Sequence, residues 1–191
     1  LSKQMQGTLV SFFNGSKDTI SEIQIDSTNT LINEIDDIFE TSDFAEFGDI
    51  LAVKAKPDQI INQGMCGRHH DLAKLEFSEG AQAGISVFDA TPRALPYTLD
   101  MMERHPKGSQ AFVPMHDNPF LVIVAADKGG QPGRPEAFLT APHTGINIHK
   151  NIWHGVLTPL SAPGLFAVID RIGNDTNIEE HWFDEAYTVI A

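Results

Sequence analysis

The sequence predicts a mainly β protein, built as an antiparallel sandwich or small barrel with a few short helices. Glycine and proline recur roughly every 8 to 15 residues after residue 50, and the runs between them are rich in β-branched and aromatic residues. No apolar pattern at helical spacing extends beyond about two turns in this part of the chain. Many short strands separated by turns are typical of antiparallel β architectures.

The N-terminal part differs from the rest in charge and in pattern. Residues 1–50 hold 10 acidic and 2 basic side chains, whereas the whole chain has 26 and 13. Apolar residues alternate over residues 20–25, which predicts a strand, and recur at helical spacing over residues 31–39, which predicts a short helix. We therefore divide the chain into an acidic N-terminal extension, residues 1–40, and one domain over residues 41–191.

The domain is expected to begin with a one-turn helix. Asp43 can cap this helix, with Glu46 three residues on, and Gly48 can end it before an apolar strand. Further along, residues 120–126 are apolar without alternation, and a loop rich in glycine and proline follows them. Such a run predicts a strand buried on both faces.

Composition limits the partners. The net charge of −13 would repel a phosphate backbone or an anionic membrane, so we expect neither as a partner. Cys66 is the only cysteine, and no apolar run approaches the roughly 20 residues that span a bilayer, so we expect a cytoplasmic protein. A small anionic substrate fits the composition, because the arginines of a binding cleft matter more than the total charge.

The segment "ERHPKGSQAFVPM", residues 103–115, carries the first candidate site residues. Glu103 and His105 are two residues apart, so on a strand they share one face, while Arg104 takes the other. Gln110 follows the turn. Glu103, His105 and Gln110 are predicted to face the interior.

A second polar pattern lies in "GINIHKNIWH", residues 145–154. Asn147 and His149 alternate with isoleucines, and an inward polar face would line a cavity. His154 is five residues from His149, which places the two side chains on opposite faces of an uninterrupted strand. Of these two histidines, the sequence favours His149 as the pocket residue.

Two more groups could bind an anion. Arg68 and His70 lie in "CGRHHDL", and Arg171 ends the apolar strand "LFAVIDR". A guanidinium can form two parallel hydrogen bonds with a carboxylate. The sequence contains no Gly-x-Ser-x-Gly motif and no glycine-rich phosphate loop after a strand.

Five segments together resemble the ureidoglycolate lyase family of allantoin degradation: "FAEFGDI", "RHHDL", "ERHPKGSQAFVPM", "GINIHKNIWHGVL" and "IDR", in this order over residues 42–184. The resemblance implies a cupin-like fold and a cytoplasmic homodimer. It also implies a lyase of purine metabolism that cleaves (S)-ureidoglycolate to glyoxylate and urea.

The resemblance also implies a metal site, because related enzymes are described with nickel. Compared with the general cupin motifs, Glu103, His105 and His149 occupy three of the four metal positions, and Gln110 stands where a carboxylate is usual. A neutral amide is a weaker ligand for a divalent ion such as Ni²⁺. The same groups could instead act as general acid and base, and the roles among Glu103, His105 and His149 stay open.

The remaining candidates are assigned to substrate binding: Arg68, His70, Gln110, Asn147, His154 and Arg171. Two other functions stay open. One is a different metal-dependent cupin enzyme, an isomerase or an oxygenase, because one fold serves many activities. The other is a cupin that binds a small carboxylate without catalysis.

Overall fold

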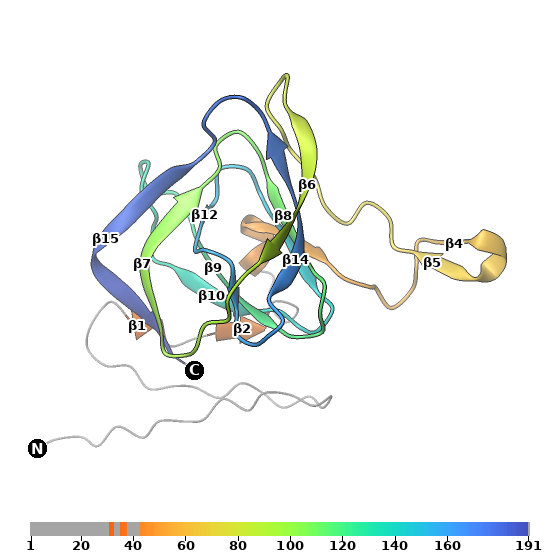
Figure 1. The fold of residues 1–191 in the computed structure, drawn as a ribbon, viewed down its shortest axis with the longest axis horizontal. Coiled ribbons are helices and arrows are strands. Elements are labelled where there is room, and N and C mark those ends of the chain that lie inside the picture. The colour runs from red at the N-terminus through yellow and green to blue at the C-terminus, as the bar shows by residue number, and fades with distance from the viewer. Residues whose placement is uncertain (1–30, 33–34, 38–42, 191) are drawn as a thin grey trace, which may run out of the picture.

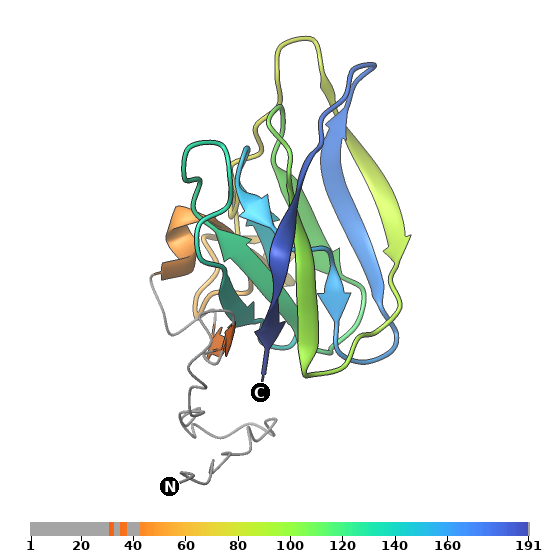
Figure 2. The same cartoon turned by 90° about the vertical axis from the view of Figure 1, so that its left-hand side faces the viewer.

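The computed structural model describes residues 31–32, 35–37 and 43–190, and these form two β-sheets packed face to face with a small third sheet beside them (Figures 1 and 2). The two main sheets remain separate, so the fold is a cupin-like sandwich rather than a closed barrel. The predicted class, mainly antiparallel β, is confirmed. None of the described helices could span a membrane.

The first sheet, sheet A, runs β1-β15-β7-β12-β9-β10-β2, with β13 paired to β9 off this path. Its strands, in that order, are Leu31–Ile32, Glu179–Val189, Tyr97–Arg104, Trp153–His154, Phe120–Ala125, Glu136–Leu139 and Ile35–Asp37, with β13 at Thr158–Pro159. The second sheet, sheet B, runs β3-β11-β8-β14-β6. Its strands are Gly48–Leu51, Gly145–Ile148, Gln110–Pro114, Leu165–Ile172 and Gln82–Asp89.

The described parts of the N-terminal extension add strands to sheet A. β1 pairs in parallel with β15, and β2 pairs in parallel with β10. The helix predicted over residues 31–39 is therefore wrong where the chain is described, because pairing with an existing sheet edge overrides a short helical pattern. The strand predicted over residues 20–25 lies outside the described residues, and the division at residue 40 stays a prediction.

The start of the domain follows the predicted signals. A 3₁₀ turn, η1, covers Asp43–Glu46, and β3 begins at Gly48. Phe44 and Phe47 from this turn are buried between the sheets. A Cβ on Gly48 would lie 2.4 Å from the backbone oxygen of Asn147, so glycine allows β3 to approach β11 closely.

The main core lies between the sheets, and β9 is at its centre. Phe120, Val122 and Val124 pack there with aromatic and aliphatic residues of sheet B. The alternate residues of β9, Leu121 and Ile123, belong to a second apolar cluster on the other face of sheet A. Every residue of β9 is buried, which confirms the prediction of a strand buried on both faces.

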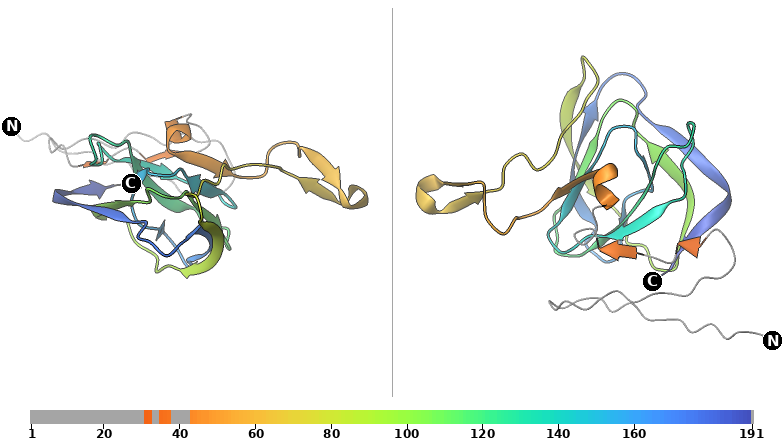
Figure 3. Two further views of the ribbon diagram at one scale, coloured as in Figure 1. Left: turned by 90° about the horizontal axis from the view of Figure 1, so that it is seen from above. Right: turned by 180° about the vertical axis from the view of Figure 1, so that it is seen from behind.

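A hairpin projects from the sandwich. β4 (Gln59–Ile61), the turn η2 (Asn62–Gly64) and β5 (Cys66–Arg68) form the third sheet, which pairs only with itself. Figure 3 shows this hairpin extending away from both main sheets. We call residues 52–74 the arm.

Candidate active site

Glu103, His105 and His154 come together on sheet A. β7 and β12 pair with Glu103 directly opposite His154, and His105 follows at the end of β7. The rings of His105 and His154 have their centroids 5.3 Å apart. One ligand atom from each of the three side chains lies within 4.8 Å of the others. We call this group the Glu–His–His cluster.

The cluster lies on the inner face of sheet A. His154 is also in register with Val124, which belongs to the core between the sheets. Residues directly opposite each other on neighbouring strands point to the same side. His154 is only 2% exposed, so the cluster is largely removed from bulk water.

Backbone carbonyls fix the protons on both histidine rings. Nδ1 of His105 lies 2.7 Å from the oxygen of Asn177, and Nδ1 of His154 lies 3.0 Å from the oxygen of Gly155. A carbonyl can only accept, so each Nδ1 carries a hydrogen, and Nε2 keeps its lone pair whenever the ring is uncharged. Both Nε2 atoms are buried without a hydrogen-bond partner. Each ring therefore presents a free lone pair within the cluster.

Burial changes the protonation of the cluster. Removal from water, helped by the nearby His105, lowers the pKa of His154 to about 4. Burial also raises the pKa of Glu103 above its usual value, and a positive charge on His105, when that ring is protonated, acts in the opposite direction. Nε2 of His105 lies 3.9 Å from Oε1 of Glu103. At neutral pH His154 is therefore an uncharged acceptor, and Glu103 holds its proton more readily than an exposed glutamate.

Stability should depend on the buried His154. The unfolded chain binds a proton at His154 near pH 6.5, but the folded protein does so only near pH 4. The free energy of unfolding is therefore highest above pH 6.5 and decreases as the pH falls toward 4. The loss is about 3 kcal/mol at most. In metal-free protein, urea unfolding at pH 7 and pH 4.5 should show a smaller pH effect for His154→Gln than for wild type. Equal pH effects in the two proteins would contradict a neutral buried His154.

The predicted geometry of residues 103–105 is confirmed. Glu103 and His105 lie in the cluster, while Arg104 points to the opposite face of sheet A and stacks on Trp153, with 4.5 Å from its Cζ to the ring centroid. Arg104 also forms ion pairs with Asp127 and Glu179, at 2.8 Å and 2.6 Å.

The expectation that Asn147 and His149 face the interior is wrong. Ile146 and Ile148 of β11 pack into the core between the sheets, so alternation turns Asn147 and His149 to the outer face of sheet B. Nε2 of His149 lies 3.1 Å from Oδ1 of Asp49. Apolar burial decided which face of β11 points inward.

Asn147 and Asp49 instead hold the returning end of the arm. The Asn147 amide donates to the backbone oxygen of Lys74 and to Asp49, and Asp49 also accepts from the backbone N–H of Lys74. Burial acts to raise the pKa of Asp49, but hydrogen bonds from Asn147 and His149 hold it below its usual value.

His154 takes the place in the cluster that the spacing in the sequence favoured for His149. The two histidines do not share one strand, because a turn at Lys150 and Asn151 separates β11 of sheet B from β12 of sheet A, and the choice between them is reversed. Gln110 begins β8 on the inner face of sheet B, in register with the core residue Ile148. Its Oε1 is buried without a hydrogen-bond partner, so it is available to a ligand between the sheets.

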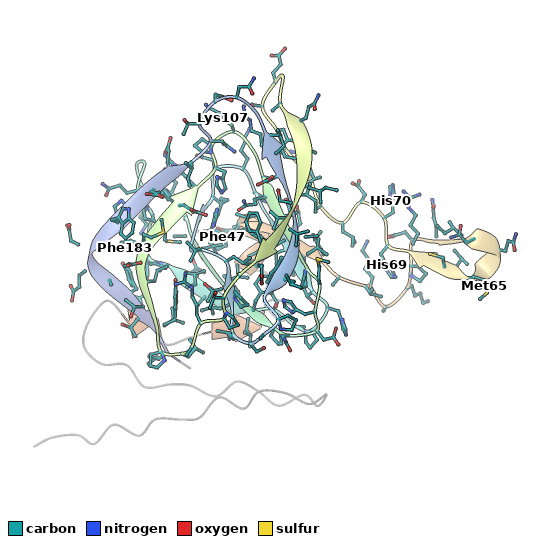
Figure 4. The ribbon with its side chains drawn as sticks, in the orientation of Figure 1. Phe47, Met65, His69, His70, Lys107 and Phe183 are labelled. Atoms are coloured by element: carbon teal, nitrogen blue, oxygen red, sulfur yellow. The ribbon has the colours of Figure 1, made fainter. Side chains whose placement is uncertain are left out.

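The three remaining predicted binding residues lie elsewhere. The guanidinium of Arg171 donates to Ser78, at 2.9 Å, and is paired with Asp175. Arg68 and His70 lie on the arm, where a guanidinium nitrogen of Arg68 is 2.9 Å from Nδ1 of His70 (Figure 4, where His70 is labelled). Their roles in substrate binding stay predictions.

Sequence reasoning missed the groups that orient the histidines. Asn177 acts through a backbone carbonyl, and its loop is 72 residues from His105, so no local spacing could have revealed it. The side chain of Asn177 also accepts from the backbone N–H of Lys107, at 2.7 Å. These bonds join the β7–β8 turn to the loop before β15.

An antiparallel sandwich that carries a glutamate and two histidines between its sheets defines a cupin-like enzyme with a candidate metal or acid–base site. A model of the family "Ureidoglycolate lyase" matches residues 35–190. The chain therefore belongs to the ureidoglycolate lyase family.

Individual relatives agree with this membership. The ureidoglycolate lyase of Rhodobacter capsulatus is 58% identical over 138 residues, which cover 72% of this chain and 86% of the relative. Ureidoglycolate lyase 2 of Rhizobium meliloti is 50% identical over 149 residues, which cover 78% and 91%. The ureidoglycolate lyase of Chelativorans sp. is 47% identical over 147 residues, which cover 76% and 89%.

Proposed function

We propose that this protein is a ureidoglycolate lyase that cleaves (S)-ureidoglycolate to glyoxylate and urea in the breakdown of allantoin. Family membership supports the substrate and the reaction class. The observation that carries the site assignment is the Glu–His–His cluster, in which two histidines of fixed tautomer present free Nε2 atoms beside a carboxyl group of raised pKa.

The reaction needs one proton acceptor and one proton donor. Removing the proton from the substrate hydroxyl lets the C–O bond become the aldehyde of glyoxylate, while the C–N bond breaks and its electron pair stays on nitrogen. Protonation of that nitrogen releases urea. Nε2 of His105 or His154 can accept the first proton, and protonated Glu103 can donate the second. Each transfer typically contributes about 100-fold to 10,000-fold.

The same cluster fits a divalent metal such as Ni²⁺. Glu103, His105 and His154 would hold the ion, because they offer one oxygen and two unprotonated nitrogens, and Gln110 is a further candidate ligand. The carbonyls of Asn177 and Gly155 orient the two rings as carbonyl partners do for many metal-bound histidines. A bound ion would lower the pKa of the substrate hydroxyl by binding its oxygen. A histidine that binds the ion cannot be the base at the same time.

Two rival functions are an oxygenase, which the same geometry allows, and a binding protein without catalysis. Two histidines and one carboxylate are also the ligand set of non-haem iron oxygenases. Family membership favours the lyase. Iron that stays with the purified protein and catalyses oxygen uptake would favour the oxygenase, and binding of small carboxylates without turnover would favour a binding protein.

The experiment is an assay on racemic ureidoglycolate with chelator-treated protein, with and without added nickel. Glyoxylate and urea should form in equal amounts, from one enantiomer, well above the spontaneous rate. Ammonia in place of urea would indicate a hydrolase and contradict the lyase. Nickel bound per chain, measured on the same samples, should fall on replacement of Glu103 or His154 if the cluster holds the ion.

The proposal includes a cytoplasmic location and a homodimer. The single cysteine, Cys66, fits a reducing compartment. Fractionation of the source cells would test the location, and the molar mass in solution would test the dimer.

A further inference from the structure

The hairpin of the arm, β4 and β5, has no strand partner outside itself among the described residues. Its two strands pair only with each other, and a lone two-stranded hairpin is marginally stable in water. Met65 at the tip is 87% exposed and Ile60 is 61% exposed. Figure 4 shows Met65 at the far end of the arm, remote from the sandwich. A hairpin with apolar residues at its tip gains stability from a surface that covers them.

The root of the arm is fixed in place. The backbone of Lys74 forms hydrogen bonds with the side chains of Asp49 and Asn147. The Ser109 N–H donates to the Glu76 carbonyl, and the Glu76 N–H donates to the Ser109 hydroxyl. At the narrow part of the arm, Asp58 accepts from the backbone N–H of His70 and pairs with Lys54. These bonds favour one direction for the arm.

The arm carries the opposite charge to the rest of the chain. Residues 52–74 contain four of the 13 basic side chains and two of the 26 acidic ones, a net charge of +2, which leaves −15 elsewhere. A second copy of this chain is therefore an electrostatically suitable surface for the arm.

An exposed apolar surface lies next to the root of the arm, on the outer face of sheet B. It consists of Ile85, Val87, Val113 and Met115, and we call it the outer apolar face. Ile85 is 79% exposed and Val87 is 63% exposed. Val87 and Val113 are both in register with Ala167, so the strands present one continuous apolar row. The root of the arm covers the β3–β11 side of the same sheet face.

Three cations near the Glu–His–His cluster already have acidic partners. Arg171 and Lys107 both pair with Asp175, and hydrogen bonds from Lys107 and Arg171 hold the pKa of Asp175 below its usual value. Arg104 is paired on the opposite face of sheet A.

Two further cations interact with groups outside the cluster. Lys150 lies near Glu76, whose pKa is lowered mainly by Lys74 and also by the charge of Lys150. Arg93 stacks on Tyr97 at the other end of β7, about 20 Å along the strand from Glu103.

We propose that two copies pack through the outer apolar face and exchange arms, so that Arg68 and His70 of each copy complete the Glu–His–His cluster of the other. Arg68 is exposed, and its guanidinium contacts the His70 ring rather than an acidic side chain, so it can form a bidentate pair with the substrate carboxylate. A two-fold dimer then contains two shared sites. This inference rests on the proposed function for the identity of the substrate.

The test is activity in a mixed dimer. Differently tagged Arg68→Ala and Glu103→Gln chains are co-expressed, and the heterodimer is isolated by two successive affinity steps. One shared site then combines an intact cluster with an intact arm, whereas the other carries both changes. The heterodimer should show about half of wild-type kcat per dimer. Each homodimeric variant should lose at least about 30-fold in kcat/KM.

Controls separate this inference from the proposed function. Lys128→Ala, which removes an exposed cation from the sandwich, should leave kcat/KM unchanged. If wild type is active but the heterodimer is as inactive as its parents, Arg68 acts within its own chain and the exchange is overturned. Full activity of the Arg68→Ala homodimer would also overturn it.

A second readout does not need substrate. The double variant Ile60→Asp with Met65→Asp should shift the molar mass in solution from dimer to monomer, while the circular dichroism of the sandwich is retained. Wild-type protein that is monomeric at micromolar concentration would contradict the exchange. Absence of lyase activity in a dimeric wild type would instead contradict the proposed function alone, because the double variant still tests the arm.

Discussion

Glu103→Gln is expected to lower turnover of ureidoglycolate by at least about 100-fold. The amide keeps the size of the side chain but can neither bind a proton reversibly nor serve as a strong metal ligand. Because burial raises the pKa of Glu103, its carboxyl group holds a proton more readily than an exposed glutamate does. Steady-state kinetics would measure the loss, and thermal unfolding would show whether the variant remains folded.

Asp100 provides a matched control for this change. It is an acidic residue on the same strand, β7, and its side chain is exposed. Asp100→Asn should keep the wild-type rate within the error of the assay. A folded Glu103→Gln protein with near wild-type turnover would remove Glu103 from the catalytic site.

His154→Ala should also reduce turnover by at least about 100-fold, because it removes one of the two free Nε2 atoms of the cluster. His149→Ala should reduce it by no more than about fivefold, because a partly exposed ion pair at the surface, such as His149–Asp49, contributes about 1 kcal/mol. Asp49 would still accept from Asn147 and from the backbone of Lys74.

This pair of variants tests which histidine belongs to the active site: His154, as the structure indicates, or His149, as the spacing in the sequence favours. A large loss in His149→Ala together with a small loss in His154→Ala would restore the assignment that spacing alone favours. Because removal of a buried ring can also destabilise the fold, His154→Gln should be measured beside His154→Ala. Both variants should lose turnover at temperatures where each is shown to be folded.

Local patterns predicted the features that depend on one segment. The apolar run at residues 120–126 predicted a strand buried on both faces, and the spacing of Glu103 and His105 placed both side chains on one face whatever the strand packs against. The turn at Asp43–Glu46 followed from its cap and from Gly48. The helix expected over residues 31–39 failed where the chain is described, because the edges of a distant sheet offered better pairing.

The sequence by itself determined the fold class, the family and two members of the cluster, because these rest on alternation, turn residues and motifs within short stretches. Only the tertiary structure decided that His154 rather than His149 joins them, since burial of Ile146 and Ile148 fixes which side of β11 is inside. It also decided that Arg68 and His70 project on an arm, because the direction of a hairpin depends on how its root packs. Contacts between residues far apart in the chain, such as that of His105 with Asn177, leave no local pattern to read.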